Sequence, residues 1–118
     1  MTTFINNIKI DQGATYNETV TWKSGKPSVP VDLTGCTAKM QVRLKLDTPT
    51  TLLELTTENG GIVLGGIMGT ITRYISDENT SLITWKTGVY DLKIMYPDGT
   101  TVRKISGTVT VSMGVTRV

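Results

Sequence analysis

The stretch VDLTGCTAKMQVR, residues 31–43, carries the clearest pattern in this chain. From Cys36 onward the side chains alternate strictly, and the apolar row consists of Cys36, Ala38, Met40 and Val42. Alternation with a period of two is typical of a strand that buries one face and leaves the other in water. We therefore predict a strand over 36–45, with Leu44 continuing the apolar row and Lys45 joining the polar one.

The same period recurs along the chain and predicts an all-β fold. Strands are expected at 14–22, 36–45, 51–57, 62–66, 69–76, 88–96 and 101–112. The first has one exception, because Glu18 interrupts an apolar row. The turn PDGT at 97–100 joins the last two strands as a hairpin. About seven or eight strands with short connections favour an antiparallel β-sandwich, Ig-like or barrel-like, with residues 1–118 as a single domain.

Three segments depart from the simple strand pattern. Residues 76–83, SDENTSLI, predict one short helix, with Ser76 as N-cap and with Leu82 and Ile83 pointing inward. The segment KSGKPSVP at 23–30 is expected to be a loop or an irregular edge. Gly107, inside the last strand, predicts a bulge or a close approach of another backbone.

Composition narrows the class of protein. The chain has 118 residues, 38% of them hydrophobic and 19% charged, which is a globular composition. Its single cysteine excludes an internal disulfide and suits a reducing compartment. The N-terminus lacks the pattern of a signal peptide, and no apolar run approaches the roughly 18 residues of a transmembrane helix. We expect neither secretion by that route nor a membrane partner.

The chain offers little for catalysis. It contains no histidine, which excludes Cys–His pairs, Ser–His–Asp triads and every zinc site that uses histidine. Cys36 begins an apolar row, where cysteine behaves as a small hydrophobic residue. We therefore predict no enzyme, no metal site and no cofactor. A carboxylate hydrolase is the one enzyme class left open, with Glu54 and Glu58 as its candidates.

Basic residues provide the only candidate surface. Lys39, Arg43 and Lys45 are expected to project together from one strand, and a second group comes from the late hairpin, with Lys93, Arg103 and Lys104. Most aromatic residues follow the apolar rows instead of lying among these charges, which argues against base stacking and nucleic-acid binding. We predict contact with a protein partner through Lys39, Arg43, Lys45 and Trp85.

Several segments resemble small β-sandwich proteins of tailed bacteriophage particles. They include GATYNETVTWKSGKPSVPVDLTGCTAKMQVR, LLELTTENGGIVL, GTITRYIS and GVYDLKIMYPDGTTVRKISGTVTVSMGVTR, which together cover nearly the whole chain. The resemblance implies turn glycines at Gly35, Gly60, Gly61, Gly88 and Gly99, and core positions at Leu33, Met40, Val42, Leu92 and Val109. It transfers no catalytic residue, and the loop 23–30 is longer and richer in proline than the family pattern.

The resemblance implies a non-catalytic virion protein of the neck, tail or baseplate region, assembled in the host cytoplasm. Its expected partners are other virion proteins, in a homo-oligomer or symmetric ring, through loops or by addition of a strand to an open sheet edge. The alternative is a carbohydrate- or host-surface-binding module in which an exposed tryptophan stacks on sugar. Trp85 is the expected exposed candidate, whereas Trp22 shares the apolar row of its strand.

Overall fold

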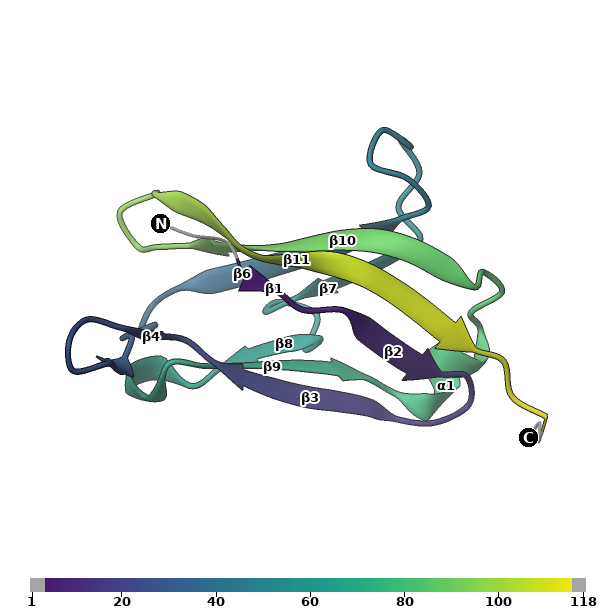
Figure 1. Ribbon diagram of the computed structural model, residues 1–118, viewed down its shortest axis with the longest axis horizontal. Coiled ribbons are helices and arrows are strands. Elements are labelled where there is room, and N and C mark those ends of the chain that lie inside the picture. The colour runs from purple at the N-terminus through teal and green to yellow at the C-terminus, as the bar shows by residue number, and fades with distance from the viewer. Residues whose placement is uncertain (1–3, 116–118) are drawn as a thin grey trace.

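The computed structural model describes residues 4–115, which form two sheets packed face to face (Figure 1). The larger sheet contains six strands: β1 (Phe4–Ile5), β2 (Ile8–Asp11), β11 (Thr101–Ser112), β10 (Thr87–Met95), β6 (Thr37–Arg43) and β7 (Leu53–Thr56). The smaller sheet contains β3 (Tyr16–Thr21), β9 (Thr70–Ile75) and β8 (Ile62–Leu64). This arrangement confirms the predicted all-β sandwich.

Shorter elements connect the strands. The ribbon of β4 (Lys23–Ser24) and β5 (Val29–Pro30) occupies the predicted loop at 23–30. The 3-10 helix η1 (Gly66–Met68) precedes β9, and the helix α1 (Asp77–Ser81) follows it. No helix in the described part of the chain is both long and apolar enough to cross a membrane.

Strands β1 and β2 were not predicted. They run parallel to β11 and pair with it on either side of Asn6 and Asn7. The two asparagines interrupt the apolar alternation, so that β1 has only 2 residues and the alternation of β2 extends over only 4. Ile8 and Ile10 nevertheless enter the core.

The core lies between the two sheets and follows the predicted apolar rows. All five core positions implied by the family resemblance are buried: Leu33, Met40, Val42, Leu92 and Val109. Of the glycines, Gly35, Gly60 and Gly99 have positive φ, as turns require. Gly88 lies inside β10 instead of a turn, where an added Cβ would be 2.8 Å from the Val42 side chain.

The strand predicted at 36–45 is shorter than expected. Strand β6 ends at Arg43, so Leu44 does not continue the apolar row and its side chain is 51% exposed. Lys45 likewise lies outside the strand. The alternation of residue types continues past Arg43, but the pairing with β7 ends at Val42 and the pairing with β10 ends at Arg43.

The hairpin and the helix agree with prediction in most details. Strands β10 and β11 form the hairpin, and the turn is held by the Thr100 N–H, which donates to Asp98 Oδ1 at 2.8 Å. Ser76 caps α1, since its Oγ accepts a hydrogen bond from the Asn79 N–H at 3.2 Å. Ile83 is buried as predicted, but the inward placement of Leu82 is wrong because its side chain is 77% exposed.

The turn ENGG at 58–61 joins strands of different sheets. Strand β7 pairs with β6, whereas β8 pairs with β9, so the chain crosses here between the layers. Asn59 organises the crossing, because its Oδ1 accepts from the N–H groups of Thr56 and Gly61, both at 2.9 Å. Side-chain bonds of this kind satisfy backbone groups that leave a sheet ladder.

Strand β11 contains a bulge, although not at Gly107. The register with β10 shifts between Leu92 and Lys93, which places Lys104 and Ile105 consecutively on the inner side. Gly107 is instead the site of a close approach, since a Cβ there would lie 2.5 Å from the Asn6 carbonyl oxygen. Glycine is required because the backbone between β1 and β2 crosses directly over it.

A buried arginine explains why Glu18 interrupts its apolar row. Arg73, on β9 opposite Glu18 of β3, is fully buried between the sheets. One of its terminal nitrogens lies 3.2 Å from Glu18 Oε1 and 2.9 Å from Asn6 Oδ1, and the other donates to the Tyr90 hydroxyl at 3.1 Å. Glu18 points inward because the buried guanidinium needs a counter-charge.

Candidate interaction face

Three basic side chains form one row across the outer face of the larger sheet. Lys93 of β10 lies directly opposite Lys39 of β6 on one side and Arg103 of β11 on the other. All three side chains are exposed. We call Lys39, Lys93 and Arg103 the basic row. It joins the two basic groups that the sequence analysis kept apart, because only strand pairing shows that they are neighbours.

The bulge in β11 decides which basic residue joins the row. Without the register shift Lys104 would face Lys93, but the bulge places Arg103 there and turns Lys104 inward. The expectation that Lys104 belongs to the basic face is therefore wrong. Its side chain is only 4% exposed, and its Nζ lies 3.8 Å from the centre of the Trp22 ring and 4.8 Å from that of Phe4.

The burial of Lys104 predicts a pH-dependent stability. Removal from water lowers the pKa of Lys104, so the unfolded chain holds this proton more tightly than the folded one. The cost of burying the charge is present below the folded pKa and disappears as the pH rises toward the ordinary lysine value of about 10.4. Relative to Lys104→Met, the wild type is therefore expected to gain stability between pH 7 and about 10.

Urea unfolding of both proteins at each pH measures this gain. Lys104→Arg is the matched control, because arginine stays charged over the whole interval. A difference between wild type and Lys104→Met that is the same at both pH values would contradict the prediction.

Arg43 and Lys45 do not extend the basic row. Arg43 is half-buried, and its guanidinium donates to the carbonyl oxygens of Thr48 and Pro49 and to Gln41 Oε1 at 2.8 Å. It thus holds the loop that follows β6. Lys45 is exposed within that loop, so Lys39, Arg43 and Lys45 do not project together from one strand.

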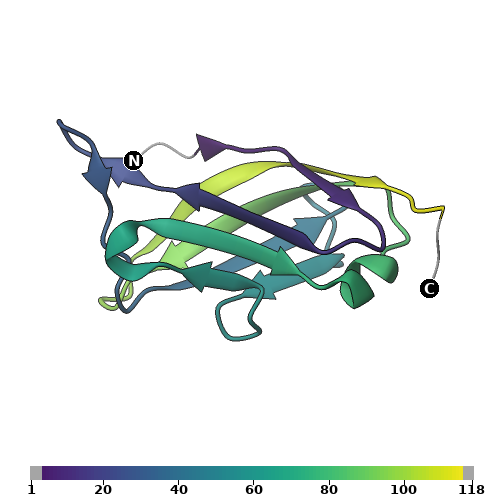
Figure 2. The same ribbon diagram turned by 90° about the horizontal axis from the view of Figure 1, so that it is seen from below.

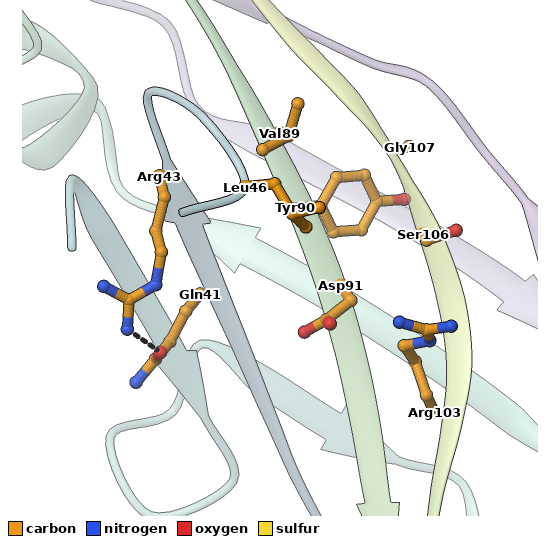
Figure 3. Close-up of a pocket in the computed structure, with 9 residues that line it drawn as sticks. All are labelled: Gln41, Arg43, Leu46, Val89, Tyr90, Asp91, Arg103, Ser106 and Gly107. Carbon is orange, nitrogen blue, oxygen red and sulfur yellow. Dashed lines mark hydrogen bonds between the residues drawn. The ribbon is translucent and has the colours of Figure 1, made fainter. Parts of the chain in front are cut away.

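A hollow of about 350 Å³ lies beside the basic row. Figure 3 shows Gln41 and Arg43 of β6 on one side, Asp91 of β10 in the middle, and Arg103 and Ser106 of β11 on the other. Leu46, from the loop that Arg43 holds, also lines it. The hollow therefore combines cationic, anionic and apolar groups, as the rims of protein interfaces do.

Two of the cations in the row have no side-chain partner in the described chain. Among residues 4–115, the side chains of Lys39 and Lys93 form no hydrogen bond and no ion pair. Like charges directly opposite one another on a sheet are destabilising. The Lys39–Lys93 pair thus has an electrostatic cost that a partner bearing carboxylates would relieve.

The structure places the candidate catalytic groups in unsuitable environments. Cys36 is half-buried, and burial raises the pKa of its thiol, which disfavours the reactive thiolate. Glu54 and Glu58 are both exposed; Glu54 accepts a hydrogen bond from Gln41 Nε2 at 2.6 Å, and Glu58 accepts one from the Thr57 hydroxyl. In the described residues no three acidic or cysteine side chains cluster as metal ligands.

Trp85 is not the exposed platform expected from the sequence. It is half-buried and packs against the hydrophobic core. Trp22 is buried, as its place in the apolar row predicts.

Comparisons with known proteins give no family. No family model matches the chain, and no curated protein is sufficiently similar to it. Among solved structures, Drosophila OTK extracellular domains 3–5 align over 89% of this chain with 15% identity and a TM-score of 0.39. The alignment covers 32% of that chain, so this protein spans about a third of its length. We draw no functional statement from this likeness.

Proposed function

We propose that this protein is a non-catalytic structural component of a bacteriophage particle that binds neighbouring particle proteins through the basic row. The binding surface is inferred from the strand register, which places Lys39, Lys93 and Arg103 side by side on three adjacent strands. Lys39 and Lys93 lie side by side with no side-chain partner among residues 4–115, which favours a binding partner that presents carboxylates. The phage particle is suggested by the sequence resemblance described above.

Other features support a binding role over a catalytic one. The hollow beside the row contains one carboxylate, Asp91, whereas hydrolysis of a glycoside requires two. The loop held by Arg43 stands above the same face and presents Leu46, whose side chain is 88% exposed. An apolar anchor next to charged groups is typical of a protein interface.

The carbohydrate-binding alternative has weaker support. Stacking on a sugar requires a free aromatic face, and Trp85 is half-buried and packs in part against the core. A glycan-array signal that disappears in Trp85→Ala would favour that alternative over the present proposal.

The proposal is tested in a phage that encodes this chain. Purified particles are expected to contain the wild-type protein, and Lys39→Glu/Lys93→Glu is expected to reduce its incorporation at least tenfold, measured by quantitative mass spectrometry. The matched control is Lys9→Glu/Lys86→Glu, which makes the same charge change at two other exposed lysines. Incorporation of the control is expected to be normal.

Stability measurements separate a lost contact from a lost fold. Reversal of Lys39 and Lys93 keeps a like-charged pair between these two positions and creates an unlike pair between position 93 and Arg103. The two effects oppose each other, so the free energy of unfolding should change by less than about 1 kcal/mol. The binding proposal is wrong if both double variants enter particles equally well, and the particle proposal is wrong if the wild type is absent from them.

A further inference from the structure

A second surface, separate from the basic row, lies along the open edge of β3. Strand β3 pairs with β9 on one side, and no strand of the described chain pairs with its other side. Figure 2 shows β3 as a long strand at the border of the smaller sheet. Its 6 residues make it the longer of the two edge strands of that sheet, since β8 has 3.

The direction of the backbone groups of β3 follows from its pairing. The Trp22 N–H, directly after the strand, donates to the Gly69 carbonyl at 2.8 Å, so even-numbered residues here bond toward β9. Antiparallel strands alternate, and the N–H and C=O groups of Asn17, Thr19 and Thr21 therefore point to the open side. Within residues 4–115, no backbone hydrogen bond from another segment occupies them.

This edge lacks most of the features that keep sheet edges apart. The strand YNETVT contains no proline, no lysine and no bulge. It has one inward-pointing charge, Glu18, which is such a feature, but Arg73 of the neighbouring strand already pairs with it. The outward side chains Asn17, Thr19 and Thr21 are exposed and uncharged.

We propose that β3 pairs in antiparallel fashion with β3 of a second copy, about a two-fold axis that passes beside Thr19. Thr19 then lies opposite its own counterpart, and Asn17 lies opposite Thr21, so that all the outward backbone groups of these residues find partners. Glu18 lies opposite Val20, and no like charges meet. The two smaller sheets join into one continuous sheet.

The side chains on the outer face favour this occupant. Thr19 Oγ1 already lies 2.8 Å from Thr72 Oγ1 on β9, a hydrogen-bonded threonine pair across the strands. The two-fold pairing extends this row from Thr72 and Thr19 of one copy into Thr19 and Thr72 of the other. Cross-strand threonine pairs stabilise sheets. The strand is therefore complementary to itself, which identifies a second copy as its partner.

The association is measured by analytical ultracentrifugation. The wild type is expected to form a dimer whose population rises with concentration, and Thr19→Lys is expected to weaken it at least tenfold because the two new charges would face each other. Val63→Lys is the matched control, since Val63 is exposed, lies opposite Thr72 on β8, and places the same charge on the same face two strands further from the axis. Thr19→Pro, which removes one outward N–H, should also weaken the dimer.

Cross-linking tests the geometry in a Cys36→Ser background. Two Thr19→Cys residues would have Cα atoms about 5.5 Å apart, within reach of a disulfide, whereas two Thr72→Cys residues would lie roughly 14 Å apart, three strand spacings. We expect covalent dimers from the first variant alone.

The inference is overturned if the wild type stays monomeric at millimolar concentration, or if it dimerises equally well when Thr19 is substituted. Because the basic row is on the other sheet, Lys39→Glu/Lys93→Glu should leave the dimer intact, so this proposal and the proposed function can fail separately.

Discussion

Replacing Glu18 by alanine is expected to lower the free energy of unfolding by about 2 to 3 kcal/mol. The variant leaves the Arg73 guanidinium fully buried, with only the neutral oxygens of Asn6 and Tyr90 as partners. An uncompensated buried charge is among the most destabilising features a protein can contain. This loss is below the roughly 3 to 5 kcal/mol of a fully buried pair because the Glu18 side chain is 42% exposed.

A double variant separates the cost of the lone charge from the loss of packing. In Glu18→Leu/Arg73→Met both ionic groups become apolar side chains of similar volume, and stability should return to within about 1 kcal/mol of the wild type. The Arg73 Nε has no hydrogen-bond partner among the described residues, so the ionic network is incompletely satisfied from the start. Urea unfolding measures all variants, and Asn17→Ala, an outward residue of the same strand, is the control. A double variant less stable than Glu18→Ala would contradict this account.

Gly107→Ala is expected to destabilise the protein by about 2 to 3 kcal/mol. The new Cβ would lie 2.5 Å from the carbonyl oxygen and 2.9 Å from the carbonyl carbon of Asn6, so the backbone between β1 and β2 must move. That movement reaches the core, because the Asn6 carbonyl accepts a hydrogen bond from the Tyr90 hydroxyl and the Asn6 side chain bonds Arg73.

The hydrogen bond between the Tyr90 hydroxyl and the Asn6 carbonyl allows the cause of this loss to be tested. Tyr90→Phe removes the hydroxyl that binds the Asn6 carbonyl, so the effects of Tyr90→Phe and Gly107→Ala should be less than additive in thermal or urea unfolding. Thr108→Ala, the exposed neighbour on β11, is the control and should change stability by less than about 0.5 kcal/mol. Strict additivity of the two substitutions would show that the displaced Asn6 is not the common cause.

Most strands could be predicted from local patterns. Alternation of apolar and polar residues identified β3, β6, β9, β10 and β11. One face of each strand is buried in the core, and burial of one face leaves a period of two in the sequence. The turn at 97–100 and the cap at Ser76 were equally readable, since both depend on residues adjacent in the chain. The strands β1 and β2 were missed because β1 has only 2 residues and the alternation of β2 covers only 4.

The basic row could be predicted from the sequence only in part. Lys39 was identified as an outward residue of its strand, but its alignment with Lys93 and Arg103 depends on two strand registers that no local pattern encodes. Trp85 was expected to be the exposed tryptophan because Trp22 shares the apolar row of its strand, but Trp85 is half-buried and packs against the core.

The amino-acid order alone therefore established the longer strands and which side of each is apolar, because both follow from neighbouring residues. Three-dimensional packing settled the rest: the bulge that buries Lys104 and presents Arg103, the crossing at Asn59 between the sheets, and the pairing of Glu18 with Arg73. These features depend on contacts between residues far apart in the chain. Register and bulges are chosen by the free energy of the whole assembly of strands, and no single strand contains that information.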